Sequence, residues 1–441
     1  MSKFVASTLM HLVISPRLLA LKRKFHERRR ARKQSTHLAT AYLRINDPHS
    51  YLLLQVMAPL AKRYPLQYDF RTVLSLQPAM YPAPELWEKN AFVDGLDLAG
   101  LYDLEFPSRP PISSQQRDAE LTAQLLHWEL QPGYLDKALA LFTAYWNDDS
   151  AALEQLTNPG VTQHLECYQQ HRLANENLLK NQGHYLSGML HYGGEWYWGL
   201  SRLEYLERRL NELGLSQDAK PPSVEFNRGH VNFCKHLDKN KVIKNTDSAD
   251  SPLEMYLSIR SPYSYIGLVR ARQLAEHYQL PLVLKPVLPM VMRRMQVPRT
   301  KGFYILQDVQ REAINYGIPF GNIADPLGRG VERCYALYDY AKSEGKGTEF
   351  MESYARGVWA EGIHSETDEG LKILVERVGL NWSKAQELVK NDSWRLWAQD
   401  NLAEMYSQDL WGVPSFKYAD RVWFGQDRLE PIETLIAEKR A

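Results

Sequence analysis

Cysteine is scarce in this sequence of 441 residues: only Cys167, Cys234 and Cys334 occur. They lie far apart and none belongs to a Cys-X-X-Cys pair. This excludes a dithiol redox motif and argues against a disulfide framework or a zinc ribbon. Such cysteine usage is typical of a reducing compartment, so we expect a cytoplasmic protein without a metal site.

The chain also lacks a marked excess of either charge, with 53 Lys and Arg against 52 Asp and Glu. The balance is uneven, because residues 1–34 contain ten Lys or Arg and one acidic residue, Glu27. The rest of the chain is therefore mildly acidic. This argues against nucleic acid as the main partner.

A long uninterrupted hydrophobic run is missing as well. The most apolar stretch, "FVASTLMHLVISPRLLAL", is broken by Pro16 and Arg17, and its basic cluster follows the apolar part. It is too short for a membrane span, and a signal peptide would place the charges first. We interpret residues 1–35 as a basic amphipathic arm. It would be docked on the protein's own surface or make a weak contact with an anionic membrane or another polyanion; a secretory signal is the remaining interpretation.

The sequence contains an internal repeat. Residues 42–66 and 256–280 align without a gap at an offset of 214 and share 11 identities in 25 positions. The segments 198–210 and 424–436 also match. This pattern predicts two copies of one domain, at 36–215 and 251–441, with a polar linker at 216–250. We expect the two copies to pack as an intramolecular pseudo-dimer.

Each copy is predicted to have the same order of elements. In the second copy a strand in 254–259 leads into a helix over 263–278 and a second strand in 280–288. A long helical middle, about 303–405, is followed by "GVPSFKYADRVWFGQDRLEPIETLIAEK", which predicts two strands joined by a tight turn at Ala419-Asp420 and a closing helix. This order predicts an α/β fold.

Ser261 and Pro262 stand where the helix after the first strand begins. Serine is a preferred N-cap and proline is tolerated at the first helical position, so both could serve the helix alone. The same geometry suits an anion, because free backbone N–H groups and a serine hydroxyl could stabilise a bound thiolate.

Two further motifs follow the helical middle. Val413-Pro414 lies just before a strand, which suggests a cis peptide whose exposed backbone could pair with an extended peptide; an ordinary proline at a strand entry is the alternative. After Gly425, Gln426 and Asp427 are expected to start the last helix. Asp427 would be either its N-cap or a carboxylate that holds an α-ammonium group.

A fourth set lies at helical spacing in the middle region: Lys301, Tyr304, Asp308 and Arg311. Spacings of three and four residues place these side chains near one face of a helix. That face is either solvated or part of a pocket.

Together these residues resemble the DsbA-like thioredoxin superfamily. They are most similar to its branch of 2-hydroxychromene-2-carboxylate isomerases and kappa-class glutathione transferases. The resemblance covers roughly 253–438 and is carried by "SPYSY", by the Lys-Tyr-Asp helix leading to "YGIPF", by "VWAEGI", and by "GVPSF" followed by "WFGQDRL". It implies two tandem thioredoxin-like folds, each with an inserted helical domain.

The resemblance also implies roles for individual residues. Ser261 would activate the thiol of glutathione, the cofactor, while Pro414 would be the cis-proline and Val413 would offer its backbone. Gln426 and Asp427 would hold the γ-glutamyl end and Lys301 would line the pocket. The substrate, an aromatic or other electrophilic small molecule, would meet Arg260, Tyr263, Ser264, Tyr304, Asp308 and Trp359.

The sequence departs from the family pattern in both copies. Ser258 replaces a usual acid and Arg260 directly precedes Ser261. In the first copy we expect Asp47, Leu190 and Ser201 at the positions of Ser261, Pro414 and Asp427, which predicts a catalytically inactive structural or regulatory partner. The alternatives to an isomerase or transferase are a non-catalytic binding or scaffold protein, and thiol-redox chemistry with an external thiol.

Overall fold

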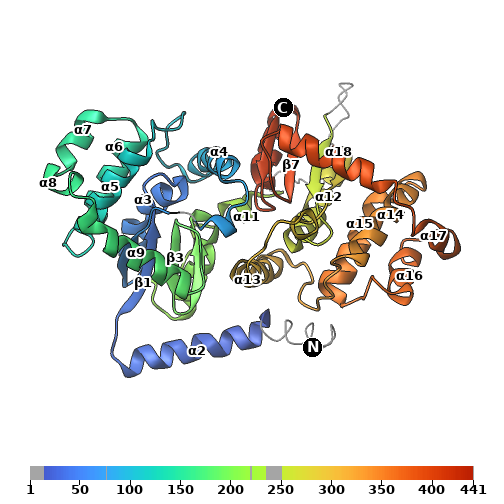
Figure 1. Cartoon of the computed structure of the whole chain (residues 1–441). Helices are drawn as coiled ribbons and strands as arrows, with labels where there is room; N and C mark the ends of the chain where they lie inside the picture. Colours follow the sequence, from blue (N-terminus) through green and yellow to red (C-terminus); the bar gives the residue numbers. More distant parts are fainter. Residues whose placement is uncertain (1–13, 76, 219–220, 235–250, 441) are drawn as a thin grey trace. The chain divides into compact units, whose positions relative to one another are not determined.

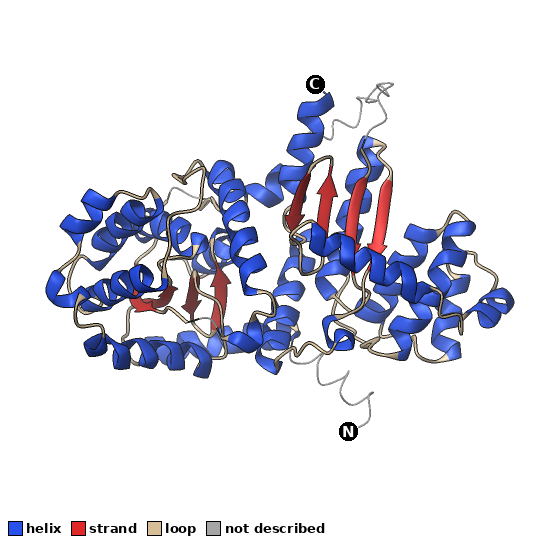
Figure 2. Cartoon of the chain, turned by 45° about the horizontal axis from the view of Figure 1, so that its top comes forward, coloured by secondary structure: helices blue, strands red, loops and turns tan. Residues whose placement is uncertain are grey.

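The computed structural model describes residues 14–75, 77–218, 221–234 and 251–440. The chain forms two compact units. The N-terminal unit is Ala20–Val231, and the C-terminal unit is Asn232–Ala441 together with the segment that ends at Leu19. Each unit is mixed α/β, mostly helical, and contains one four-stranded sheet with helices around it (Figure 2).

The N-terminal unit has its sheet in the order β2-β1-β3-β4. β1 pairs with β2 in parallel and with β3 in antiparallel, and β3 pairs with β4 in antiparallel. Its elements in chain order are α2 (Pro16–Arg32, which begins before this unit), β1 (His37–Leu43), α3 (Pro48–Arg63), β2 (Leu66–Thr72), η1 (Pro78–Met80), α4 (Pro84–Tyr102), α5 (Gln115–Trp128), α6 (Tyr134–Trp146), α7 (Ser150–Leu156), α8 (Pro159–Thr162), α9 (Glu166–Asn181), β3 (Met189–Tyr192), β4 (Glu195–Trp198), η2 (Leu200–Arg202), α10 (Leu203–Glu212) and α11 (Arg228–Asn232).

The C-terminal unit has its sheet in the order β6-β5-β7-β8, with the same three pairing directions. Its elements are β5 (Leu253–Leu257), α12 (Pro262–Tyr278), β6 (Leu282–Pro286), η3 (Met290–Arg293), α13 (Arg299–Tyr316), α14 (Arg329–Ser343), α15 (Gly347–Arg356), the short π-helix η4 (Gly357–Glu361), α16 (Asp368–Glu376), α17 (Trp382–Leu388), α18 (Trp394–Ser407), β7 (Ser415–Tyr418), β8 (Arg421–Phe424) and α19 (Leu429–Arg440) (Figure 1). The predicted strands, helical middle, Ala419-Asp420 turn and closing helix of this half are confirmed.

Each unit buries its own hydrophobic core. In the C-terminal unit, α12 packs on β5 and β6 and contacts α13, α15 and α19. The core includes Trp359, whose indole Nε1 donates a hydrogen bond to the Ile259 carbonyl at 3.0 Å. In the N-terminal unit Trp146 makes the corresponding bond to the Ile45 carbonyl at 3.2 Å. In both cases a buried indole holds the backbone that leads from the first strand to the next helix.

Part of the segment expected to link the halves is packed against the N-terminal unit. The buried carboxylate of Glu207 accepts hydrogen bonds from the backbone N–H groups of Glu225 and Phe226, both at 2.9 Å. Arg63 contacts Glu207 and also forms an ion pair with Asp218 at 2.6 Å. Residues 235–250 of the expected linker lie outside the described residues.

The expected N-terminal arm is described from residue 14 onward, and residues 16–32 are helical. Arg23 of α2 forms a two-pronged ion pair with Glu195, at 2.8 and 2.9 Å. The side chain of His26 lies against Gly194. Through Arg23 and His26, α2 is therefore docked on the N-terminal unit. Among the described residues, no helix has the length and apolar character needed to cross a bilayer.

The indole hydrogen bond of Trp359 leads to a stability prediction. Trp359→Phe should lower the free energy of unfolding of the C-terminal unit by about 1–3 kcal/mol, because it leaves the buried Ile259 carbonyl without its donor. Trp397→Phe is the matched control, since its indole bonds the exposed carboxylate of Asp339; it should cost less than about 1 kcal/mol. Hydrogen exchange followed by mass spectrometry reads the two units separately, and equal losses in both variants would contradict the prediction.

Candidate functional site at the start of helix α12

Ser261 caps α12, as the sequence predicts. Its backbone is extended, its Oγ accepts the Ser264 N–H at 3.2 Å, and Pro262 occupies the first turn. The same Oγ donates a longer hydrogen bond, 3.4 Å, to the Val413 carbonyl. The hydroxyl therefore lies between the positive end of a helix and the loop that carries Pro414.

The Val413-Pro414 peptide bond is cis, which confirms that prediction. The Pro414 carbonyl accepts the Gly425 N–H at 3.0 Å, so the turn after β8 is tied to the loop before β7. A Cβ added to Gly267 of α12 would lie 3.4 Å from Pro414 Cγ. The absence of a side chain at Gly267 lets α12 approach the proline loop closely.

Ser264, which was predicted to meet the substrate, is buried and makes a structural hydrogen bond. It is only 2% exposed, and its hydroxyl accepts the Ser258 N–H at 3.3 Å. Trp359, placed in the same predicted pocket, is 4% exposed and stacks on Phe320 at 6.2 Å between ring centres. Both residues support the strand-to-helix turn from inside the core.

Gln426 and Asp427 lie in the turn before α19. That helix begins at Leu429, so the expectation that Gln426 and Asp427 start it is wrong by two residues. The Gln426 side chain is 1% exposed, and its amide donates to Glu312 at 2.6 Å. Arg270 donates to the backbone carbonyl of Gln426 at 2.8 Å and to its side-chain oxygen at 3.3 Å. Asp427 is more accessible, with 16% of its side chain exposed, and lies 3.3 Å from Arg428.

The face of α13 that carries Tyr304 and Asp308 is buried, so its interpretation as a solvated face is wrong. Asp308, 1% exposed, accepts a hydrogen bond from the Tyr263 hydroxyl at 2.6 Å and lies 2.5 Å from Arg311. The structure therefore brings Tyr263, two residues after Ser261, onto a buried carboxylate of α13. Tyr304 is 9% exposed on the same helix.

Lys301 begins this face of α13. Its Nζ lies 5.8 Å from the centre of the Trp411 ring, within cation–π range. Burial disfavours the charged amine and lowers the pKa of Lys301 to about 8. A lysine in this state can exchange a proton near neutral pH, which an exposed lysine does poorly.

Arg260 makes a two-pronged ion pair with Asp325, both bonds being 2.9 Å. Asp325 follows α13 by nine residues and has 46% of its side chain exposed. The positive charge next to Ser261 is therefore shared with a carboxylate that the sequence did not single out. Arg270 and Glu312, which enclose Gln426, were also missed, because nothing in their local sequence indicates a partner more than a hundred residues away.

These residues fit part of a thiol-bearing peptide. The α12 N-terminus and the Ser261 hydroxyl suit a thiolate, and Asp427 is partly accessible to an ammonium group. The Gln426 side chain does not fit its assigned role in this arrangement, because Glu312 and Arg270 enclose it.

The corresponding turn of the N-terminal unit has different chemistry. Asp47 caps α3, and its carboxylate accepts from the His49 N–H at 3.3 Å and the Ser50 hydroxyl at 2.7 Å. The strand register corrects one assignment: Tyr42 pairs with Met189 as Tyr256 pairs with Ser415, so the residue in the place of Pro414 is Gly188. Leu190 lies two residues further on, inside β3.

The lowered pKa of Lys301 predicts a pH-dependent stability. An unfolded lysine keeps its proton to about pH 10.4, so between pH 8 and roughly 10.4 the unfolded chain binds more protons than the native one. The free energy of unfolding should rise across this window in the wild type, and the rise should be smaller in Lys301→Met. Urea unfolding at several pH values measures this difference. Identical pH profiles would mean that the native amine titrates like an unfolded one, and Lys439→Met serves as a surface control.

In a comparison with known proteins, the C-terminal unit matches a protein family. The family described as DSBA-like thioredoxin domain matches residues 252–437. The 2-hydroxychromene-2-carboxylate isomerase of Pseudomonas putida is 23% identical over 193 residues, which cover 41% of this chain and 92% of the isomerase.

Two solved structures are each similar to less than half of the chain. A 2-hydroxychromene-2-carboxylate isomerase has a TM-score of 0.38 and 22% identity, covering 42% of this chain and 95% of its own. The cytosolic disulfide reductase DsbM from Pseudomonas aeruginosa, solved with GSH, has a TM-score of 0.32 and 15% identity, covering 43% and 98%. The sequence match places a DsbA-like thioredoxin domain, with isomerase relatives, over the C-terminal half.

Proposed function

We propose that the C-terminal unit is a glutathione-dependent isomerase or transferase acting on an aromatic or other electrophilic small molecule. The observation that carries this proposal is the position of the Ser261 hydroxyl, between the N-terminus of α12 and the Val413-Pro414 loop. The named activity of the isomerase relatives supports the reaction class.

The chemistry of Ser261 follows from its bonding. As N-cap it already accepts the Ser264 N–H, so its own hydrogen is directed elsewhere. Its present acceptor, the Val413 carbonyl, lies at 3.4 Å, which is long for a hydroxyl donor. A thiolate in front of the helix would be a stronger acceptor and would also gain from the helix dipole. Bound glutathione would supply the nucleophilic thiol that this position of the protein lacks.

The surrounding residues have distinct roles in this proposal. Lys301, with a pKa of about 8, stabilises negative charge or passes a proton to the substrate. Tyr263 is held by Asp308 and acts as a positioned wall of the site. Asp427 holds the ammonium group of glutathione, while Arg260, neutralised in part by Asp325, borders the substrate.

Serine at position 261 separates this proposal from dithiol chemistry. A protein thiol at that position would be needed to form a mixed disulfide, and Cys167, Cys234 and Cys334 all lie elsewhere in the chain. The three free cysteines also suit a reducing, cytoplasmic location. The isomerase and the transferase that we propose have one feature in common: each is a DsbA-family enzyme that uses a thiol from outside the chain.

We also propose that the two units are copies of one thioredoxin-like fold. Matching backbone bonds support this: Val73 N–H to the Leu43 carbonyl at 2.9 Å corresponds to Val287 N–H to Leu257 at 2.8 Å. Gly199 N–H to Gly188 corresponds likewise to Gly425 N–H to Pro414. The shared sheet order and pairing directions agree with a duplication in which the N-terminal copy has lost the serine and the proline.

Calorimetric titration of reduced glutathione tests the proposed activity. The wild type should show saturable binding, and Asp427→Asn should weaken it about tenfold through loss of a charge-assisted contact. Ser261→Ala should raise the pKa of the bound glutathione thiol by roughly 1–2 units, because a hydrogen bond to a charged group is worth about 1.5–3 kcal/mol. Thiolate absorbance in the ultraviolet measures that pKa.

Ser343→Ala, on α14, is the matched control and should change neither quantity. Absence of binding at millimolar glutathione would overturn the proposal and favour a non-catalytic scaffold. If Ser261→Ala still binds glutathione and the pKa of the bound thiol is the same as in the wild type, Ser261 does not stabilise the thiolate.

A further inference from the structure

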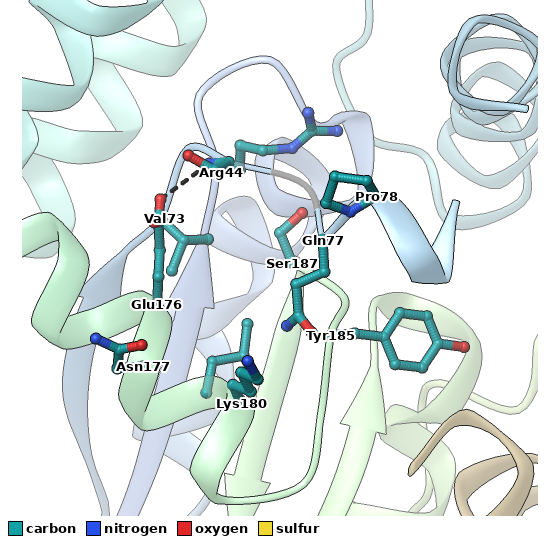
Figure 3. A pocket seen from close by; sticks show the side chains of 11 residues that line it. Arg44, Val73, Gln77, Pro78, Glu176, Asn177, Lys180, Tyr185 and Ser187 are labelled. Carbon is teal, nitrogen blue, oxygen red and sulfur yellow. Dashed lines mark hydrogen bonds between the residues drawn. The ribbon is translucent and has the colours of Figure 1, made fainter. Parts of the chain in front are cut away.

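The N-terminal unit contains a cavity of about 220 Å³ at one edge of its sheet. Arg44 directly follows β1, Val73 directly follows β2, and Ser187 lies two residues before the antiparallel β3. The cavity therefore opens at the carboxyl ends of two parallel strands, the usual place for ligands in an open α/β sheet. Figure 3 shows the lining, which is Arg44, Val73, Ser75, Gln77, Pro78, Glu176, Asn177, Leu179, Lys180, Tyr185 and Ser187.

Arg44 is the unusual member of this lining. It is 3% exposed, and its Nε has no acceptor among the described residues. Its Nη1 lies 3.5 Å from Glu88, at the limit of a hydrogen bond, and the side chain of Glu88 is half exposed. Buried guanidinium groups are normally matched by close carboxylates, so this charge is poorly compensated.

The other charges of the cavity leave a positive balance. Lys180, which is exposed, lines the cavity together with Arg44 (Figure 3). Glu176, the acidic residue of the lining, has its charge offset by Arg172 at 3.3 Å, and its carboxylate also accepts the Leu74 and Ser75 N–H groups, at 3.2 and 2.9 Å.

The rest of the lining is apolar or hydroxyl-bearing. Val73, Leu179 and Pro78 offer hydrocarbon surface, and Ser187 and Gln77 offer polar atoms. A ligand that matches this distribution has one anionic end and an apolar body. A carboxylate suits the planar fork of arginine, and the cavity volume limits the body to about the size of one ring.

We propose that the N-terminal unit binds a small organic carboxylate with an apolar body in this cavity, anchored by Arg44. The inference is separate from the glutathione proposal, because it uses another sheet and other residues. It gives the unit that lacks a Ser261 equivalent a binding role of its own.

Titration of the full chain with benzoate tests this inference, with neutral benzamide as the matched ligand. Benzoate should bind in the millimolar range or tighter and benzamide at least tenfold more weakly. Arg44→Met should reduce benzoate affinity at least tenfold, and Ser187→Ala and Lys180→Gln should reduce it two- to fivefold. Ser261→Ala, in the other unit, should leave it unchanged.

The rim variant Lys180→Gln keeps the test valid even where Arg44→Met fails to fold. Equal affinity for benzoate and benzamide, or no benzoate binding at 10 mM (about the weakest affinity such a titration detects), would overturn the proposal. Loss of benzoate binding in Ser261→Ala alone would place the carboxylate in the C-terminal site instead.

A second inference arises from the outer face of α2. Its inner side is fixed through Arg23 to Glu195. Leu21 and Phe25 are 62% and 63% exposed, one turn apart on the helix. Lys24, Arg28 and Arg32 are exposed at helical spacing on the same side. This side of α2 therefore offers two exposed apolar side chains among exposed basic ones, and basic residues are attracted to the surface of an anionic bilayer.

We propose that this face of α2 binds an anionic lipid surface. The basic residues would supply long-range attraction, and Leu21 and Phe25 would enter the headgroup region. A nucleic acid or another soluble polyanion would use the charges and leave the two apolar side chains without a role. The pair Leu21 and Phe25 therefore distinguishes these partners.

Co-sedimentation with vesicles tests the lipid contact. The chain should bind vesicles of phosphatidylcholine with 30% phosphatidylserine, a roughly physiological anionic content, and bind pure phosphatidylcholine vesicles much more weakly. The double variant Leu21→Ser, Phe25→Ser should lose at least fivefold, and Lys24→Gln should lose about fivefold at low salt. Lys439→Gln, on α19, is the charge-matched control. Unchanged vesicle binding in the double variant, or equal binding to both vesicles, would overturn the proposal; binding of heparin alone would assign the charges to a soluble polyanion.

Discussion

The strand-to-helix turn between β5 and α12 is the constraint on which the C-terminal site depends. Its backbone must leave a buried strand and begin a helix within four residues, and each exposed N–H group needs a partner. Ser261 satisfies the Ser264 N–H, and the Ser264 hydroxyl satisfies the Ser258 N–H. The indole of Trp359 satisfies the Ile259 carbonyl. Once these bonds are made, the Ser261 hydroxyl has one direction left, towards the Val413 loop.

Local features of this turn could be predicted from sequence, because capping and proline placement act over three or four residues. The cap at Ser261, the proline at the start of α12 and the cis bond at Val413-Pro414 follow from such short-range rules. The bonding of Gln426 could not be predicted, since its partners Arg270 and Glu312 are 156 and 114 residues away. The low pKa of Lys301 also depends on burial that only the packing of α13 decides. Leu190 was misplaced because the helical middles differ in length, and only the strand register shows that Gly188 occupies the place of Pro414.

The two units show how one turn can hold opposite charges. In the N-terminal unit the carboxylate of Asp47 lies at the start of α3, where it accepts from His49 N–H and Ser50. A second anion there would meet direct repulsion. A positive charge, Arg44, lies three residues earlier, beside the cavity at the strand ends. The same shift of three residues leads from Ser261 to Ser258, which carries no charge.

The charged residues of the C-terminal site bear on the anion that we propose it binds. Asp308 is fully engaged by Tyr263 and Arg311, so it contributes little free negative potential. The charge of Arg260 is shared with Asp325 but remains within reach of solvent. Burial of Lys301 disfavours its charged form and lowers the pKa of its amine to about 8. A thiolate or carboxylate beside Lys301 would offset this effect and raise the pKa of the amine. In the function that we propose, an anion bound near Lys301 would therefore favour the protonated amine, which could then act as a general acid.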